Sequence, residues 1–299
     1  MLLNKVIKEF LLECEIRNYT PKTIKGYRNT LYFFSNYLKQ YQEVEDLEDV
    51  SVPMIKQFIM WEDKSSRKPS YINGQIKVLR AFFKYCKQED YDYVDMKKIS
   101  WQKENKIKIK TFNPGEVKKM LSYFTGNDFT SIRNKTMLYA LFETGIRCQE
   151  LCDLMPEDVK ESFILIRNGK NHKDRIVPLS PILQKQIMKY LRSRERYIDC
   201  KKHDDELFLS FHYKKLTVGA VEVIIRKVGQ ALQITNARVS PHTCRHFFAQ
   251  QCIRNGMDVY SLSRLLGHEN ISITQRYLQD LTDQDIVTKA VEKSVIMSL

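Results

Sequence analysis

Apolar residues recur at helical spacing through the first hundred positions of the chain. One stripe follows a threonine–proline pair, an arrangement typical of a capped helix start with proline in the first turn. It comprises Ile24, Tyr27, Leu31, Phe34 and Leu38, after Thr20 and Pro21. A second stripe follows Ser70 and comprises Ile72, Ile76, Leu79 and Phe83. The pattern predicts about four helices and a helical domain over residues 1–99.

A different pattern begins after residue 99. Residues 100–112 are rich in lysine, including Lys106 and Lys108, and lack the apolar periodicity of a core helix. They are predicted to form an extended basic linker. Asn113 and Glu116 then have the spacing of a capping box, with Pro114 between them in the first turn. A second domain is therefore predicted over residues 113–299.

The second domain is predicted to be mainly α with a small antiparallel sheet. Two β-rich runs, residues 162–167 and 175–179, flank a polar turn and predict a hairpin. Residues 207–210, "LFLS", are predicted to add a third strand. The later helices are predicted at residues 181–197, 217–233, 241–255, 258–266 and 271–278.

The charge of the chain favours a polyanionic partner. Its 299 residues include 49 Lys and Arg against 36 Asp and Glu, a formal net charge of +13. Such an excess favours phosphate-rich partners, because each neutralised phosphate releases condensed counterions. Lys77, Arg80, Lys84 and Lys87 lie on one face of a predicted helix. This stripe is interpreted either as a solvated surface or as a contact for a phosphate backbone.

The cysteines and the N-terminal stretch indicate the compartment in which the protein is expected. Charged residues interrupt the apolar N-terminal stretch, so it is neither a signal peptide nor a membrane span. The seven cysteines form no disulfide framework, which favours the reducing cytoplasm. Cys148 and Cys152 lack a second pair at zinc-finger spacing and are interpreted as buried side chains.

The stretch "SPHTCRHFF" brings together several side chains that can bind a phosphate or transfer a proton. Ser240 and Pro241 predict a helix start, so His242, Arg245 and His246 share one face near the positive end of the helix dipole. Arginine can hold a phosphate through two hydrogen bonds, and histidine can transfer a proton near neutral pH. A zinc site at the two histidines is disfavoured, because Thr243 replaces the glutamate of the protease motif and Arg245 would repel a cation.

Further reactive residues lie elsewhere in the same predicted domain. Arg147 follows an apolar helix, with Glu150 three residues later, and Lys170 lies at the hairpin turn. The stretch "LLGHENISITQRY" adds His268 and Tyr277. The set suits phosphoryl transfer without a metal, since arginines can neutralise the phosphate oxygens. Tyr277 would be the nucleophile, and its hydroxyl would need cationic neighbours and a proton acceptor.

These motifs, in this order and spacing, resemble the tyrosine recombinases of the phage integrase and Xer family. The resemblance covers residues 113–299, and the N-terminal domain resembles the SAM-like core-binding domain of that family. It implies that Arg147 and Arg245 hold the scissile phosphate and that Lys170 protonates the departing 5′ hydroxyl. It further implies that His242 assists proton transfer, that His268 bonds a phosphate oxygen and that Tyr277 forms a 3′-phosphotyrosine. Glu150 would orient the first arginine.

Two positions modify what the resemblance implies. Asn171 stands where the family often has glycine after the hairpin lysine, which leaves Lys173 as an alternative general acid. Asparagine tolerates the left-handed backbone, so the turn itself can persist. His246 follows the second arginine, as a histidine commonly does in the family, and is interpreted as structural.

The resemblance also implies partners. Double-stranded DNA with specific recombination sites is expected, contacted by Lys77, Arg80, Lys84, Lys87, Lys106 and Lys108, with no metal or nucleotide cofactor. A homo-tetramer on DNA is expected, with a related recombinase or an accessory protein as a further partner. A type IB topoisomerase-like activity and a catalytically inactive DNA-binding protein are the alternatives.

The end of the chain carries one more predicted helix. After Thr282, an apolar stripe comprises Ile286, Val287, Ala290, Val291 and Val295. The resemblance favours an exchange helix that docks on a neighbouring protomer, and docking on its own domain is the alternative.

Overall fold

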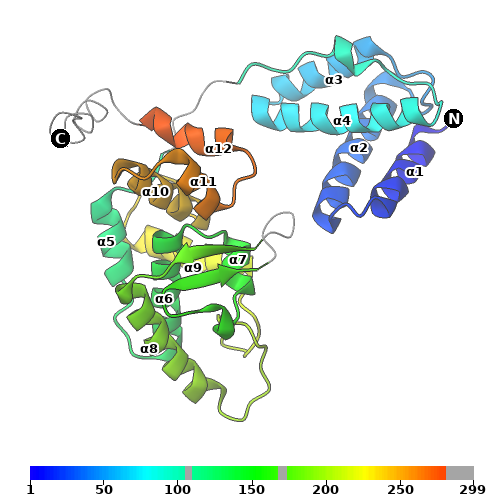
Figure 1. Cartoon of the computed structure of the whole chain (residues 1–299). Coiled ribbons are helices and arrows are strands. Elements are labelled where there is room, and N and C mark those ends of the chain that lie inside the picture. Colours follow the sequence, from blue (N-terminus) through cyan, green and yellow to red (C-terminus); the bar gives the residue numbers. More distant parts are fainter. Residues whose placement is uncertain (105–109, 168–173, 281–299) are drawn as a thin grey trace, which may run out of the picture. The chain divides into compact units, whose positions relative to one another are not determined.

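A computed structural model describes residues 1–104, 110–167 and 174–280 of the chain. The chain divides into two compact units, residues 1–106 and 107–299 (Figure 1). This division falls inside the predicted linker.

The first unit consists of the four predicted helices and a short 3₁₀ turn. These elements are α1 (Leu3–Ile16), α2 (Pro21–Gln42), α3 (Val52–Lys64), α4 (Pro69–Gln88) and η1 (Met96–Lys98). The cap expected before α2 is present, since Thr20 Oγ1 accepts a hydrogen bond from the Thr23 amide at 3.3 Å. The predicted start of α4 at Ser70 is one residue late. Pro69 takes the first helical position, which suits its fixed φ angle and missing N–H.

The first residues of the predicted linker contact the first unit, and its last residues contact the second unit. The side chain of Asn73 in α4 bonds the backbone of Gln102, with N–O distances of 2.9 and 3.0 Å. Trp101 lies under the guanidinium of Arg80, 4.4 Å from the ring centroid. At the other end, Phe112 is buried in the core of the second unit. The first and last residues of the segment 100–112 therefore contact the folded units on either side of it.

The second unit is built around α6, which packs against α5, α8 and α10. Its elements are α5 (Pro114–Ser122), α6 (Phe129–Thr144), α7 (Cys148–Asp153), η2 (Pro156–Asp158), β1 (Phe163–Ile166), β2 (Arg175–Pro178), α8 (Pro181–Ile198), α9 (Val218–Ala231), α10 (Pro241–Arg254), α11 (Val259–Leu266), α12 (Ile271–Gln275) and η3 (Arg276–Asp280). The capping box before α5 is confirmed, because Asn113 and Glu116 each accept the other's backbone N–H at 2.8 Å. Among the described residues, no helix is long and apolar enough to cross a membrane.

The sheet contains only the predicted hairpin within the part of the chain that the structure describes. β1 and β2 are antiparallel, with Phe163 opposite Pro178 and Ile166 opposite Arg175. The third strand predicted at residues 207–210 is wrong. Leu207 bonds the carbonyl of Leu154, and Leu209 forms a single bridge with Lys215. The apolar run reflects complete burial of these side chains in the core rather than membership of the sheet.

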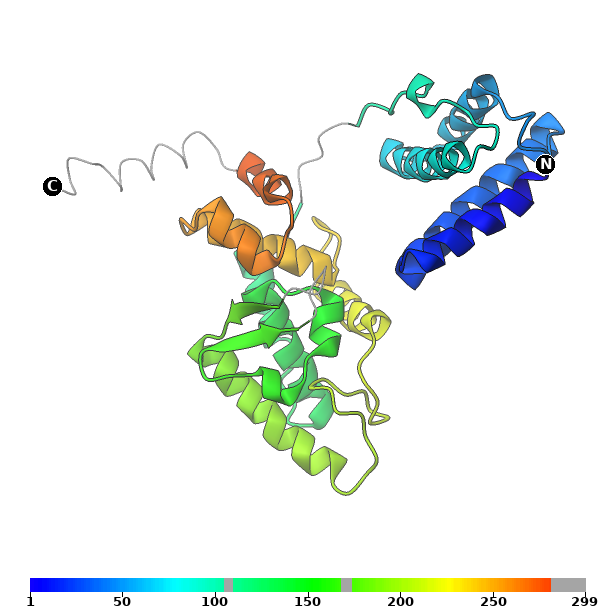
Figure 2. The ribbon, with the colours of Figure 1, turned by 45° about the vertical axis from the view of Figure 1, so that its right-hand side comes forward.

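A separate small core joins the last helices of the second unit. α10, α11 and η3 bury Phe248, Ala249, Ile253, Leu262, Leu266 and Tyr277. These helices lie at one end of the unit, and α8 extends toward the opposite end (Figures 1 and 2). α11 also packs against β2, which brings the hairpin beside the end that holds Tyr277.

Candidate active site

The segment between α6 and α7 presents Arg147. Gly145 ends α6 with a φ of 60°, and a side chain at this position would collide with the ring of Phe248. Arg147 then precedes α7, and Glu150 accepts hydrogen bonds from its backbone N–H and from its Nη1, both at 2.8 Å. The carboxylate therefore fixes both the backbone and the guanidinium of Arg147.

A second arginine, which the sequence analysis assigned no role, shares the same carboxylate. Arg175 in β2 donates from Nη1 and Nη2 to the two oxygens of Glu150, at 2.8 and 2.6 Å. Its Nε donates to the carbonyl of Leu265 at 2.8 Å. Burial raises the pKa of Glu150, but Arg175 and the backbone and side chain of Arg147 outweigh it and lower the pKa to about 2. Glu150 is thus a buried anion between two cations.

Arg245 lies on the inward face of α10 and is only 3% exposed. Nη1 donates to the carbonyl of Gly145 at 2.7 Å, and Nη2 donates to the carbonyl of Leu266 at 2.6 Å. Burial and the charge of Arg147 lower its pKa to about 10, so the guanidinium stays protonated at neutral pH. The hydrogen bonds hold this cation in one orientation before any substrate arrives.

The turn after α11 connects both predicted phosphate-binding arginines. Gly267 adopts a φ of 64°, and its carbonyl accepts a hydrogen bond from Arg147 Nη2 at 2.8 Å. The next residue, His268, lies with Nε2 at 2.9 Å from Arg245 Nη2 and with Nδ1 at 2.8 Å from Thr274 Oγ1. Because arginine can only donate, Nε2 is the acceptor and the ring proton is on Nδ1. Burial and neighbouring arginines lower the pKa of His268 to about 4.

Tyr277 is buried next to this cluster, with 3% of its surface exposed. Its hydroxyl lies 2.8 Å from Nδ1 of His246. Burial raises the pKa of Tyr277, while the charges of Arg245 and Arg276 oppose that rise. His246 was interpreted as structural, and its contact with the tyrosine hydroxyl is the feature that this interpretation missed.

His242 occupies the expected first turn of α10 but does not bond the tyrosine among the described contacts. The cap before it is present, since Ser240 Oγ accepts the Thr243 amide at 3.3 Å. The ring of His242 is exposed and lies against that of His246, with centroids 4.1 Å apart. Within the described residues, no group of three His, Cys, Asp or Glu side chains is placed to hold a metal.

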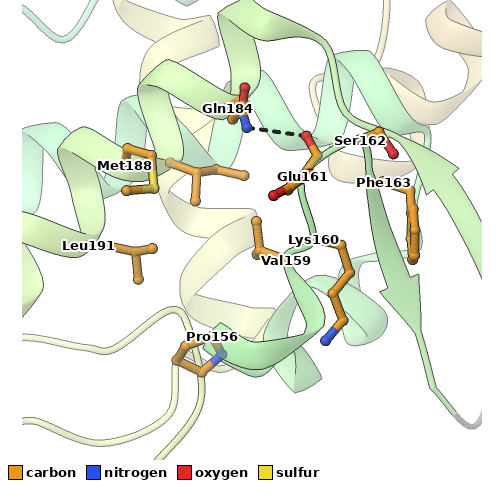
Figure 3. A pocket seen from close by; sticks show the side chains of 10 residues that line it. Pro156, Val159, Lys160, Glu161, Ser162, Phe163, Gln184, Met188 and Leu191 are labelled. Atoms are coloured by element: carbon orange, nitrogen blue, oxygen red, sulfur yellow. Dashed lines mark hydrogen bonds between the residues drawn. The ribbon is translucent and has the colours of Figure 1, made fainter.

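One groove among the described residues lies away from this cluster. Its volume is about 610 Å³, and its lining comes from the η2–β1 region and α8 (Figure 3). Gln184 Nε2 donates to the carbonyl of Glu161 across it at 3.1 Å. None of the arginines, histidines or tyrosine described above lines this groove. The reactive residues instead gather around the α11–α12 turn.

Comparison with known proteins shows the family of the chain. Residues 110–284 match the phage integrase family, and residues 7–90 match the phage integrase N-terminal SAM-like domain. The chain belongs to the phage integrase family. Its two domain matches correspond to the two units, and the SAM-like match confirms the fold expected for the first.

Relatives of this integrase-family chain are tyrosine recombinases. Tyrosine recombinase XerD of Listeria monocytogenes is 30% identical over 92% of this chain and 94% of its own. Tyrosine recombinase XerA of Thermococcus onnurineus is 29% identical over 98% of this chain and 96% of its own. These relatives place the chain among the tyrosine recombinases, at the level of the family.

Solved structures support the same fold. XerH recombinase bound to a palindromic difH substrate has a TM-score of 0.76 at 20% identity, over 99% of this chain and 84% of that one. The Tn1549 transposon integrase bound to transposon right-end DNA has a TM-score of 0.71 at 18% identity, over 98% and 99%. The mainly helical fold with a small antiparallel sheet is confirmed.

The other residues predicted from the sequence lie on α4 or outside the described part of the chain. Lys77, Lys84 and Lys87 are exposed on α4. Arg80 differs, because its Nη2 donates to the carbonyl of Ile99 at 2.7 Å. Predicted residues outside the described part are Lys106, Lys108, Lys170 with its alternative Lys173, and the C-terminal segment 281–299.

Proposed function

We propose that this protein is a site-specific DNA recombinase that cuts and rejoins double-stranded DNA through a 3′-phosphotyrosine at Tyr277. One observation carries the proposal. Arg147 and Arg245, which come from distant segments, are both bonded to the α11–α12 turn that also holds His268. Tyr277 is buried in the small core beside that turn. Two fixed cations beside a tyrosine suit attack on a phosphodiester.

The arginines would act on the non-bridging oxygens of the scissile phosphate. Their charges offset the negative charge that develops as the tyrosine oxygen attacks, the role that metal ions play in many other phosphoryl transfers. Because carbonyl groups and Glu150 already orient both guanidiniums, little reorganisation is needed during the reaction. His268 would bond a phosphate oxygen once the charge of the bound phosphate favours the protonated ring, which can donate from Nε2 as well as from Nδ1.

Proton transfer completes the cleavage. Lys170, or Lys173 as its alternative, would protonate the 5′ oxygen as the P–O5′ bond breaks, and His242 would assist transfer from the phenol. The phosphotyrosine retains the energy of the broken phosphodiester, so a 5′ hydroxyl of another strand can reseal it. The relatives named tyrosine recombinase favour recombination, and we infer that a tetramer of this chain exchanges strands between two DNA sites.

Two other functions remain as alternatives with distinct outcomes. A type IB topoisomerase-like enzyme would relax supercoiled plasmid without a recombination site. An inactive DNA-binding protein would bind DNA without forming an adduct. The intact set of Arg147, Arg245, His268 and Tyr277 favours the recombinase over the inactive protein.

The first test traps the covalent intermediate. A duplex obtained by binding selection would be nicked so that cleavage releases a short fragment and prevents resealing. The wild-type protein should form an adduct that resists denaturation, and Tyr277→Phe should form none while its DNA affinity stays within about twofold. The substitution removes only the attacking oxygen. Gel electrophoresis under denaturing conditions would measure the adduct.

A matched control separates Tyr277 from the other tyrosines. Tyr260 in α11 is 63% exposed, and Tyr260→Phe should retain the adduct. EDTA should leave wild-type cleavage unchanged. An adduct with Tyr277→Phe would exclude Tyr277 as nucleophile, whereas no adduct with the wild type would favour the inactive DNA-binding protein.

A further inference from the structure

The contact between His246 and Tyr277 joins two elements that are about thirty residues apart in sequence. His246 lies in the second turn of α10, and Tyr277 lies in η3. The hydroxyl oxygen and Nδ1 are 2.8 Å apart, and the ring planes are tilted by 59°. Both side chains lie in a largely buried environment, where a polar contact is stronger than in water.

His242 is less well placed for direct contact with the nucleophile. It lies one helical turn before His246, is exposed, and packs against the His246 ring with a tilt of 66° between the planes. Among the described contacts, its path to Tyr277 runs through His246. The order of the three groups is therefore His242, His246 and the tyrosine hydroxyl.

We propose that His246 is the residue that receives the phenolic proton of Tyr277 during strand cleavage, an inference that rests on the proposed function. The bond between the Tyr277 oxygen and phosphorus forms as the P–O5′ bond breaks. The phenolic proton moves to Nδ1 of His246, and the 5′ oxygen takes a proton from the lysine acid. Resealing reverses these transfers, and the imidazolium of His246 returns its proton to the departing tyrosine oxygen.

The electrostatics of the pair fit this role. Burial, with His242 and Arg245, lowers the pKa of His246 to about 4, so its ring is neutral at neutral pH and Nδ1 can accept a proton. Burial also raises the pKa of Tyr277, so the phenol does not ionise without an acceptor. A bound phosphodiester adds a negative charge beside the rings, which raises the pKa of His246 and strengthens it as a base.

The test compares two substitutions of His246 in single-turnover cleavage of the nicked duplex. His246→Asn places an amide near the position of Nδ1 and can keep the hydrogen bond, but it cannot take the proton. His246→Phe keeps the ring volume and loses the bond. Both should cleave about 10²- to 10⁴-fold more slowly, the range typical of general base catalysis, with unchanged DNA affinity.

A more acidic nucleophile separates proton transfer from positioning. Replacing Tyr277 with 3,5-difluorotyrosine makes the phenol ionise more readily, so the need for a base decreases. His246→Asn should then cost less than about tenfold in rate, against the much larger loss with ordinary tyrosine. An equal loss with both nucleophiles would overturn the proton-acceptor role.

Other outcomes of these experiments separate failure of the His246 role from failure of the proposed function. If His242→Asn is rescued by difluorotyrosine and His246→Asn is not, the proton goes to His242 and the inference is wrong. If the wild type forms the adduct and His246→Asn cleaves at the full rate, the inference alone fails. If the wild type forms no adduct, the proposed function fails, and the role of His246 fails with it.

Discussion

His268 and His246 are both held in the neutral form, which links the stability of the site to pH. Burial is the main cause, with neighbouring charges, and it lowers each pKa to about 4. In the unfolded chain the pKa of histidine is about 6.5. Between these values the unfolded state binds protons that the folded state does not, so the free energy of unfolding decreases as pH falls from about 6.5 to about 4. Above about pH 6.5 this loss is absent.

We therefore predict that the thermal midpoint falls between about pH 6.5 and about pH 4, and that His268→Gln reduces this fall. Glutamine can still accept the hydrogen bond of Arg245 without binding a proton. Far-UV circular dichroism at several pH values would measure the midpoint. The exposed His212 provides the control His212→Gln. The prediction is wrong if His268→Gln retains the full pH dependence of the wild type.

At the scale of single residues, the sequence identifies the reactive residue types and their spacing. It does not identify which of these side chains contact one another. His242 and His246 are four residues apart, so the helical period places them on one face. Which of them meets Tyr277 depends on how α10 packs against η3, and local spacing carries no such information. Arg175 begins the second predicted β-rich run, residues 175–179, yet its pairing with Glu150 depends on tertiary packing that this local pattern does not contain.

Among the elements, the hairpin connects most closely to the site through Arg175. This side chain joins β2 to Glu150 and to the end of α11 through three hydrogen bonds. It also packs against Gly267, where an added Cβ would lie 3.1 Å from Arg175 Cδ. Strand β2 is thus tied to the segments that carry Arg147 and His268.

We predict that Arg175→Ala destabilises the protein by about 3 kcal/mol, because Glu150 remains buried with one partner removed. Cleavage of the nicked duplex should slow by more than about tenfold while DNA affinity is nearly retained. Arg192→Ala in α8 is the control, since Arg192 is exposed. Urea denaturation and single-turnover cleavage would measure both effects. Equal losses for the two variants would contradict a specific role of Arg175.

Element starts were easier to predict than strands. Thr20, Asn113 and Ser240 each cap a helix through a local hydrogen bond, so the signal lies within four residues of sequence. Residues 207–210 were predicted wrongly because a short apolar run indicates burial in either conformation. Their backbone partners, including Leu154, are distant in sequence and leave no local pattern.

The whole molecule combines a basic surface helix in one unit with the reactive cluster in the other. The helical periodicity and the capping box at Asn113 allowed the two-part organisation to be predicted, and the motif order allowed the family to be predicted. The net charge of +13 indicated a polyanionic partner. The charge alone could not tell which cations are available to a partner. Arg80 shares the stripe of Lys77 and Lys84, yet its guanidinium is bound to Ile99 and Trp101.

We predict that the exposed lysines of α4 contribute to DNA affinity without affecting the chemistry. Replacing Lys77 and Lys84 with alanine should weaken binding and reduce the slope of log affinity against log salt by about 0.9 for each phosphate that is no longer neutralised. Adduct formation at saturating DNA should keep its rate, because the cluster around Tyr277 lies in the other unit. The control is Lys5→Ala with Lys8→Ala, which removes the same charge from exposed positions on α1. A fluorescence anisotropy titration at several salt concentrations would measure the slopes. An equal change in both double variants would mean that net charge, rather than the face of α4, determines the affinity.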